Sequence, residues 1–592
     1  MMSDEIILGL HFGHDATVVL MKNGVVIEAM SEERLSRQKK YVGFPHLSLA
    51  YIKEKYNIKD FPHVIAVGEK KELNGFLFTT LEDNKKGRSS KKQGKWFLRA
   101  IGVRFKTVGY IYSLRDYFLN KYANRNNDKA DDFLKQKFPN STITYLHHHL
   151  AHAYATLPFL PDNKKRLIFT LDGAGDDLSG SINIFENGSI ERVHRIELRD
   201  SLGLLYSSFT DLLGMSRNEH EFKVMGLAPY AKKTSGEKVY QKLKEILFFN
   251  EETMTLSSKI PLDKTYGYYG TAFLIANDYF QYRFDSLAYG IQKLTEETMK
   301  DMVRASIKKY NCGNIAAGGG VFMNVKANQA VVELNEVENF VVAPSCGDES
   351  LAIGAAVYGY AKLHNENLSE LSKIDNLYLG SSYSDEEIKK ELDANKFIES
   401  CHITYFDPKS NTTIEKKVAE LLANNSVVGR FKGRSEWGAR ALGNRSILAN
   451  PSSRDNVKLI NEMIKGRDFW MPFATSIREE RIDDYLENPK RVYAPFMAIT
   501  FNSKPLAQKE LIAALHPYDL TSRPQIVKRS VNNDYHALIS HFETLTGSGG
   551  VLNTSFNLHG EPNVETPSDA IRTFELSGLP HLAIGNYLVS KK

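Results

Sequence analysis

The chain has 592 residues, of which 42% are hydrophobic and 25% are charged, and its formal net charge is +5. These values are typical of a soluble globular protein with more than one domain, and the charge is too small for this length to indicate a nucleic-acid partner. We expect no membrane span and no signal peptide, because no apolar run is long enough and the first residues lack a basic segment. The three cysteines form no spacing pattern, which favours a cytoplasmic protein.

Residues 5–30 and 166–192 follow the same plan of strand, glycine-containing polar turn, strand and Asn-Gly hairpin. The polar turn contains His14 in the first stretch and Asp172 in the second. Glycine-rich turns behind a strand expose backbone N–H groups that suit phosphate oxygens. The repetition predicts a duplicated α/β domain with a cleft between its halves, although two unrelated hairpins would give the same local pattern.

A basic insert interrupts this domain around residues 70–130, and its stretch from Lys85 to Lys95 is strongly basic. A solvated loop is one interpretation. The other is that the insert forms part of the entrance for an anionic acceptor. Because the polar segment that begins at residue 365 lacks glycine loops, we expect a first domain at 1–366 and a second at 367–592.

The segment His148-His149-Leu150-Ala151-His152 follows an apolar, strand-like run and is expected to begin a helix. On a helix, His148 and His152 project from one face, where two imidazoles bind one metal ion. The alternative is a hydrogen-bonded histidine cluster. Two acidic turns, at Asp172 and Asp348, favour the metal, because a carboxylate would complete such a site; Asp348 would otherwise cap the helix that follows it.

A further glycine turn, Gly318-Gly319-Gly320, lies between a short strand and a helix that begins after Asn324. Close packing of a helix on a strand is one explanation for three consecutive glycines. The other is a nucleotide loop, because the turn occurs where the second half of a nucleotide-cleft fold requires one.

Beyond residue 427, arginines alternate with glycines and small residues from Arg430 to Arg445. Cationic turns follow at Lys465–Arg467 and Arg523, and the segment Asn553–Asn557 adds amide and hydroxyl groups. Because the planar guanidinium is a preferred ligand of phosphate and carboxylate, these turns predict a pocket for a compact polyanion. A nucleic-acid surface would instead show interleaved lysines and aromatic platforms.

Distinctive short segments occur in order along nearly the whole chain. In the first half they are GHDA (13–16), EERLSRQK (32–39), HHLAHA (148–153), LDGAGD (171–176), KVMGLAPY (223–230), GGGVFMN (318–324) and CGDESLAIGAA (346–356). In the second half they are GRSEWGARALGNRSILANP (433–451), KGRDFWMPFA (465–474), RPQ (523–525) and SFNLHGEPNVETPSDAI (555–571). Through them the chain resembles the O-carbamoyltransferase family of nodulation-factor, tobramycin, novobiocin and cephamycin carbamoyltransferases. Ala439 stands where the family has proline, residues 516–521 match loosely, and the basic insert has no clear counterpart.

The resemblance implies a two-domain α/β enzyme. The first domain would be of the actin/sugar-kinase kind and similar to threonylcarbamoyl-transferases, with a metal and a nucleotide site. The second would be a YrdC-like domain that forms carbamoyladenylate. Carbamoyl phosphate and ATP, with Mg²⁺, would react in the second domain, and the carbamoyl group would then pass to an acceptor hydroxyl in the first.

The resemblance also implies roles for individual residues. Carbamoyl phosphate and ATP would be bound by Arg440, Arg445, Lys465, Arg467, Arg523, Asn553 and Ser555, of which Lys465 and Arg523 are also catalytic. A divalent ion, Fe²⁺ or another transition metal, would be held by His148, His152, Asp172 and Asp348. The adenylate would contact Gly318, Gly319, Gly320 and Asn324. His14 would be the general base for the acceptor hydroxyl, unless Asp15 holds it as a structural residue.

Two other functions remain open at this stage. A small-molecule kinase of the same superfamily would explain the glycine turns but not the second, cationic pocket. A non-catalytic nucleotide-binding or assembly protein would not explain the arginine cluster. The sequence identifies neither the acceptor nor the oligomeric state, although it allows a homodimer, and we expect small-molecule substrates and no nucleic acid.

Overall fold

The computed structural model describes residues 4–70, 73, 129–260, 262 and 278–592. Contacts between its residues divide the chain into two compact units. The first unit comprises Met1–Glu33 and Lys40–Lys373, and the second comprises Arg34–Lys39 and Ile374–Lys592. The short segment Arg34–Lys39 therefore groups with residues that follow it by more than three hundred positions. Most of the basic insert lies outside the described residues.

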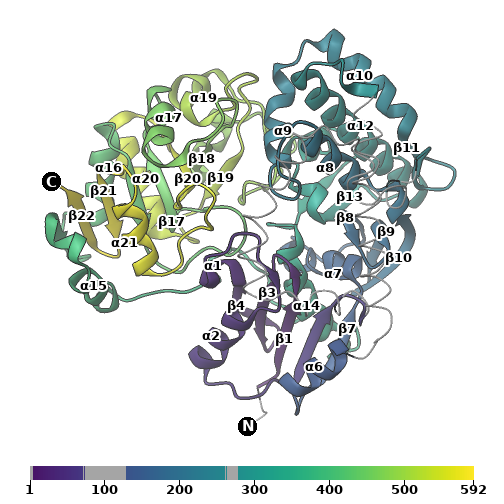
Figure 1. The fold of residues 1–592 in the computed structure, drawn as a ribbon, viewed down its shortest axis with the longest axis horizontal. Coiled ribbons are helices and arrows are strands. Elements are labelled where there is room, and N and C mark those ends of the chain that lie inside the picture. Colours follow the sequence, from purple (N-terminus) through teal and green to yellow (C-terminus); the bar gives the residue numbers. More distant parts are fainter. Residues whose placement is uncertain (1–3, 71–72, 74–128, 261, 263–277) are drawn as a thin grey trace, which may run out of the picture. The chain divides into compact units, whose positions relative to one another are not determined.

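The first unit is built from two five-stranded sheets with the same strand order (Figure 1). The first sheet runs β4 (Val25–Ser31), β3 (Thr17–Lys22), β1 (Ile6–His11), β6 (His63–Val67) and β7 (Thr142–Leu146). The second runs β10 (Ser189–Glu197), β9 (Leu178–Glu186), β8 (Arg166–Gly175), β13 (Asn314–Gly318) and β14 (Asn339–Val342). In each, the first three strands are antiparallel and the last two are parallel to the third. The predicted duplication is confirmed.

Helices pack on these sheets, and short strands connect them. The helices are α1 (Glu32–Ser36), α2 (His46–Tyr56), α6 (Lys129–Lys137), α7 (His148–Tyr154), α8 (Leu202–Leu212), α9 (Glu221–Leu227), α10 (Lys233–Ile246), α12 (Phe284–Tyr310), α13 (Val325–Val332) and α14 (Leu351–Leu363). The short strands are β2 (Gly13–His14), β5 (Val42–Gly43), β11 (Leu247–Asn250) and β12 (Thr255–Ser258). Helix α14 packs on β1 and β6 and against α7, and it is buried along nearly its whole length because it is rich in alanine and aliphatic residues.

The topology gathers several polar turns at one edge of the sheets. Helix α7 begins two residues after β7 ends, and Gly318 closes β13 beside Thr170 of β8. Asp348 begins the short 3-10 turn η6 (Asp348–Ser350) that leads from β14 into α14. The carboxyl ends of parallel strands meet at one edge of an α/β sheet, which is where ligands usually bind.

The second unit is a mixed eight-stranded sheet with helices on both faces. Its order is β15 (Cys401–Tyr405), β22 (Tyr587–Lys591), β21 (His581–Ile584), β16 (Val428–Phe431), β17 (Arg445–Ala449), β20 (Gly550–Ser555), β18 (Ala474–Arg478) and β19 (Pro524–Val527). The helices are α15 (Asp385–Ala394), α16 (Ile414–Ala423), α17 (Asp455–Ile460), α18 (Ile482–Tyr485), α19 (Pro505–Glu510), α20 (Asn533–Thr546) and α21 (Pro567–Glu575). The α/β class expected for this part of the chain is thus observed.

Neighbouring residues of this sheet belong to different cores. Ile447 packs in a core with α15 and α21, whereas Leu448 packs in a second core with α16 and α20. In the same way, Val427 lies in the first of these cores and Val428 in the second. Successive side chains of a strand point to opposite faces, so a sheet covered on both faces requires such apolar runs. Across the described ranges, no helix combines the length and apolar content that a membrane crossing requires.

The contact between α7 and α14 depends on a glycine. A Cβ atom at Gly354 would lie 1.9 Å from the backbone oxygen of Ala151, so any side chain there must separate the two helices. We expect Gly354→Ala to lower the free energy of unfolding by about 2 kcal/mol or more, measured by urea denaturation.

The matched control is Gly173→Ala, whose Cβ would meet only Leu204 Cδ2 at 3.8 Å. It is expected to leave the unfolding midpoint nearly unchanged. Equal stability of the two variants would show that the α7–α14 contact does not depend on this close approach.

Candidate functional site

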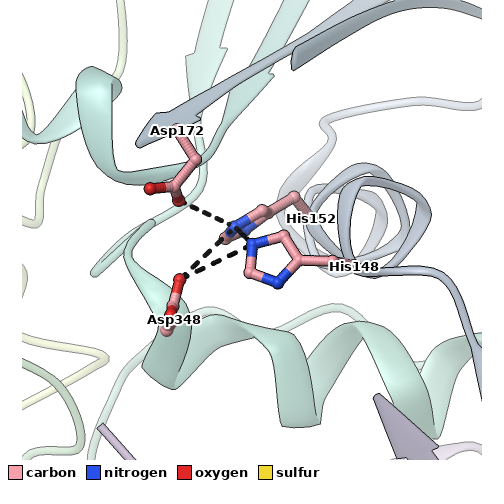
Figure 2. A group of neighbouring side chains, drawn as sticks. All are labelled: His148, His152, Asp172 and Asp348. Carbon is pink, nitrogen blue, oxygen red and sulfur yellow. Dashed lines mark hydrogen bonds and ion pairs between the residues drawn. The ribbon is translucent and has the colours of Figure 1, made fainter. Parts of the chain in front are cut away.

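Two histidines and two aspartates of the first unit converge on one point (Figure 2). The ligand atoms of His148, His152, Asp172 and Asp348 all lie within 4.8 Å of one another. The two Nε2 atoms are 3.1 Å apart, and His152 Nε2 is 3.0 Å from Asp172 Oδ2. Asp348 Oδ1 lies 3.7 Å from the Nε2 of His148 and 3.8 Å from that of His152. The four residues predicted as metal ligands are therefore adjacent.

Backbone and side-chain contacts fix the direction of both imidazoles. His147 caps α7 by accepting the backbone N–H of His149. The backbone N–H of His148 donates to Asp176 Oδ2 at 2.6 Å, which ties the start of the helix to the acidic turn of β8. His152 is fully buried, and its Nδ1 lies 3.4 Å from Ser350 Oγ. The Nε2 atoms of both rings are therefore left to face the two carboxylates.

The glycine turn after β13 supports Asp172. The backbone N–H of Gly320 donates to Asp172 Oδ2 at 2.8 Å. Gly319 has a φ of 96°, and a Cβ there would lie 2.3 Å from the oxygen of Leu171. The turn comes this close to β8 only because Gly319 has no side chain, and it places backbone N–H groups beside the aspartate.

Burial and the neighbouring charges shift the pKa values of His148, Asp172 and Asp348. Burial and the adjacent His152 lower the pKa of His148 to about 3. Burial, Asp172 and Asp15 raise the pKa of Asp348 well above its usual range. Although burial opposes it, the two histidines and the Gly320 N–H hold the pKa of Asp172 below its usual range. The lowered pKa keeps the His148 imidazole neutral at neutral pH, as metal coordination requires.

This donor set fits a divalent metal ion. Neutral imidazoles with carboxylates are ligands of first-row transition metals. Opposed ring nitrogens 3.1 Å apart and carboxylates within 4.8 Å leave a single point that all four ligand atoms face. Asp172 and Asp348 are partly exposed, so a substrate oxygen has access to the same point.

His14 lies on β2, and its side chain is exposed. Burial of its ring nitrogens and nearby Lys40 lower its pKa, while Asp15 and Asp172 oppose the change. The neighbouring Asp15 pairs with Lys40 Nζ at 2.8 Å, so this carboxylate has a partner other than the histidine. His14 is thus close enough to Asp172 for their charges to interact.

Asn324 is part of a polar network on α12 and α13. Its Oδ1 caps α13 by accepting the Ala327 N–H at 3.0 Å, and its Nδ2 donates to Gln292 Oε1 at 2.8 Å. Gln292 also donates to Glu296 at 2.8 Å and accepts from Tyr206 OH at 2.9 Å. Gln292 and Glu296 were not predicted, because polar residues four apart on a long helix usually mark its solvated side.

A group of cations lies together in the second unit. Burial, Arg467 and Lys39 lower the pKa of Lys465 well below its usual range. Burial, Arg440 and Arg467 do the same for Arg523, and burial and Arg440 lower the pKa of Arg467 to about 10. We call Lys39, Arg440, Lys465, Arg467 and Arg523 the cation cluster. Mutual repulsion of buried like charges marks a site that an anion would stabilise.

Lys465 is held by the loop that follows β20. Its Nζ donates to Asn557 Oδ1 at 2.8 Å and to Ser555 Oγ at 3.2 Å. Arg467 donates to Thr554 Oγ1 at 2.8 Å and lies over the ring of Phe473. The predicted Ser555 is therefore beside Lys465, and Asn557, which belongs to the same polar segment, contacts both.

Two of the residues predicted to bind substrate have interior contacts instead. Arg445 is fully buried, donates to the oxygens of Lys432, Gly433 and Asn444, and lies 3.6 Å from the centroid of the Phe431 ring. Asn553 is also buried, and its Nδ2 donates to Ala441 O, Ser476 Oγ and Gln525 Oε1. These contacts favour a structural role for both, because they direct the polar groups at the protein backbone and core.

Family models match both parts of the chain. The carbamoyltransferase N-terminus matches residues 6–357 and the carbamoyltransferase C-terminus matches residues 419–591. An uncharacterized protein of Methanocaldococcus jannaschii is 33% identical over 99% of this chain and 99% of its own length. Nodulation protein NolNO of Sinorhizobium fredii is 29% identical over 98% of this chain and 79% of its own. Full-length HypF in a phosphate- and nucleotide-bound form is 13% identical, with a TM-score of 0.33 over 61% of this chain and 56% of its own, a likeness too distant to indicate function.

Metal binding at the four converging residues should release a proton. Burial, Asp172 and Asp15 raise the pKa of Asp348, which favours the protonated carboxyl in the empty site, and an ion that binds there must displace that proton. We therefore expect Co²⁺ binding to release protons, with an apparent affinity that rises with pH. Calorimetric titration in buffers of different ionisation enthalpy measures this.

Asp348→Asn has no such proton and should release none. Asp177→Asn, which changes an exposed carboxylate of the acidic turn, should leave the proton count as it is. Release that persists in Asp348→Asn would exclude Asp348 as the source.

Proposed function

Because this chain belongs to the carbamoyltransferase family, we propose that it is an ATP-dependent O-carbamoyltransferase that proceeds through carbamoyladenylate. Carbamoyl transfer itself is the activity of the family. The donor would be carbamoyl phosphate, and the acceptor would be a hydroxyl group of a biosynthetic product. The single observation that supports the ATP-dependent route best is the cation cluster, because carbamoyl phosphate and a triphosphate are both compact polyanions.

The first step would take place at the cation cluster. Carbamoyl phosphate, ATP and one water would give carbamoyladenylate, pyrophosphate and phosphate. Arg440, Arg467 and Arg523 would neutralise the phosphates, because guanidinium groups bind phosphate oxygens in pairs. Lys465 would lie at the reacting group beside Ser555 Oγ, which is within reach to orient the carbamoyl amide. We assign this step to residues 367–592.

The second step would take place in the first unit, residues 1–366. His14 would take the proton of the acceptor hydroxyl, since its lowered pKa keeps the imidazole neutral near pH 7. The hydroxyl oxygen would bond to the carbamoyl carbon, and AMP would leave. Fe²⁺ or another divalent ion at His148, His152, Asp172 and Asp348 would supply a Lewis acid that stabilises the negative charge of the leaving phosphate. Gly318–Gly320 and Asn324 would contact the adenylate.

A small-molecule kinase is the alternative for the first unit. The duplicated fold and the glycine turn are compatible with a kinase. A kinase reaction does not, however, explain the cation cluster of the second unit. A kinase would release ADP, whereas the proposed reaction releases AMP and pyrophosphate.

The two steps should separate in variants. His148→Ala/His152→Ala is expected to retain pyrophosphate release that depends on carbamoyl phosphate, because the cation cluster is unchanged. It should lose carbamoyl transfer, measured as the mass gain in a panel of hydroxyl-bearing sugars, polyols and glycans. Arg523→Gln should instead lose pyrophosphate release by about 100-fold and still bind a divalent ion.

Thermal unfolding serves as the control that both variants remain folded. If the histidine variant, still folded, lost pyrophosphate release to the same degree as transfer, the assignment of the two steps to two sites would be wrong.

A further inference from the structure

The segment Arg34–Lys39 leaves the first unit and makes its contacts in the second. The two residues that flank the segment belong to the first unit and are hydrogen-bonded to each other: the backbone N–H of Lys40 donates to Glu33 Oε2 at 2.8 Å. Its start is held in the second, where the buried Arg34 donates to the oxygens of Glu436 and Gly438 at 3.1 Å each. Six residues from the N-terminal part of the chain are thus a component of the second unit.

Arg37 of this segment binds the Glu561–Asn563 turn of the second unit. Its NH1 donates to Asn563 O at 2.7 Å and its NH2 donates to Pro562 O at 2.9 Å. Its Nε lies 3.3 Å from Asp569 Oδ1. The residue has a φ of 57°, a left-handed conformation that costs about 1 kcal/mol or more in a residue with a side chain. This conformation persists because the guanidinium is held at several points.

The turn that Arg37 holds leads directly to Lys465. Asn557 Nδ2 donates to Glu561 O at 2.8 Å, next to Pro562 in the chain. Asn557 Oδ1 accepts from Lys465 Nζ at 2.8 Å and from Ser555 Oγ at 2.6 Å. A continuous set of contacts therefore runs from the guanidinium of Arg37, through the turn and Asn557, to the two groups placed at the carbamoyl donor.

We propose that Arg37 is a positioning residue of the anion site: it holds the Glu561–Asn563 turn so that Asn557 keeps Lys465 and Ser555 in place for the donor. This inference rests on the proposed function. A guanidinium suits this place because its separate, coplanar N–H groups reach two successive carbonyl oxygens and the Asp569 carboxylate, a spread that the compact ammonium of lysine does not reproduce. The donor site of the C-terminal unit is therefore complete only with residues from the N-terminal part of the chain.

The test measures binding of inorganic pyrophosphate by calorimetry to the full-length protein and to three variants. Arg37→Ala is expected to raise the dissociation constant about tenfold, with the melting temperature little changed because Arg34 still holds the segment. Arg37→Lys keeps the charge but not the paired contacts, so it should lose nearly as much. Arg572→Ala is the matched control, since this exposed arginine pairs with the Glu561 carboxylate without touching the turn's backbone oxygens, and it should bind pyrophosphate normally.

The same variants are compared in pyrophosphate release that depends on carbamoyl phosphate. At saturating substrates Arg37→Ala should lower kcat about 100-fold, and millimolar guanidinium, but not ammonium, should restore part of it. Normal pyrophosphate binding by Arg37→Ala, or full recovery in Arg37→Lys, would overturn the positioning role. If the unmodified protein binds pyrophosphate but releases none from ATP, the proposed function fails, while the binding comparison still decides the role of Arg37.

Discussion

The repulsion within the cation cluster of the second unit is the constraint on which this account depends. Burial and mutual repulsion lower the pKa values of Lys465, Arg467 and Arg523. Gathering such groups is unfavourable for the empty protein, so the surrounding contacts must hold them in place. Thr554, Ser555 and Asn557 supply oxygens to Lys465 and Arg467. A bound polyanion would relieve the repulsion. The free energy recovered in this way would favour the binding of phosphates.

The candidate site of the first unit has acidic groups and imidazoles where the second unit has cations. Imidazoles and carboxylates face one another there, and burial together with the neighbouring acids Asp172 and Asp15 raises the pKa of Asp348. The scaffold is the duplicated sheet, whose strand ends bring α7, the acidic turn of β8 and η6 to one edge. In the proposed function, the second unit would bind anions and the first a cation, which would suit a donor that is activated as a phosphate anhydride and then attacked beside a metal.

Patterns with a direct physical cause were predictable from the sequence. The repeated strand-turn-strand plan predicted the duplication, and the spacing of His148 and His152 predicted their shared face. Contacts that depend on the folded chain were not predictable. Arg445 is a residue type that commonly binds phosphate, yet in the folded chain its guanidinium donates to backbone oxygens. The sequence placed Asn557 in a polar segment, but its contacts with Lys465 and with the Glu561 oxygen depend on the folded chain. Lys39 was missed because it is distant in sequence from the cluster that it joins.

Exchange between ATP and labelled pyrophosphate tests the central claim most directly, because it reports formation of carbamoyladenylate and needs no acceptor. The account predicts exchange that depends on carbamoyl phosphate, with AMP rather than ADP as the nucleotide released when an acceptor is supplied. Exchange that does not require carbamoyl phosphate, no exchange at all in a folded protein, or release of ADP would contradict it.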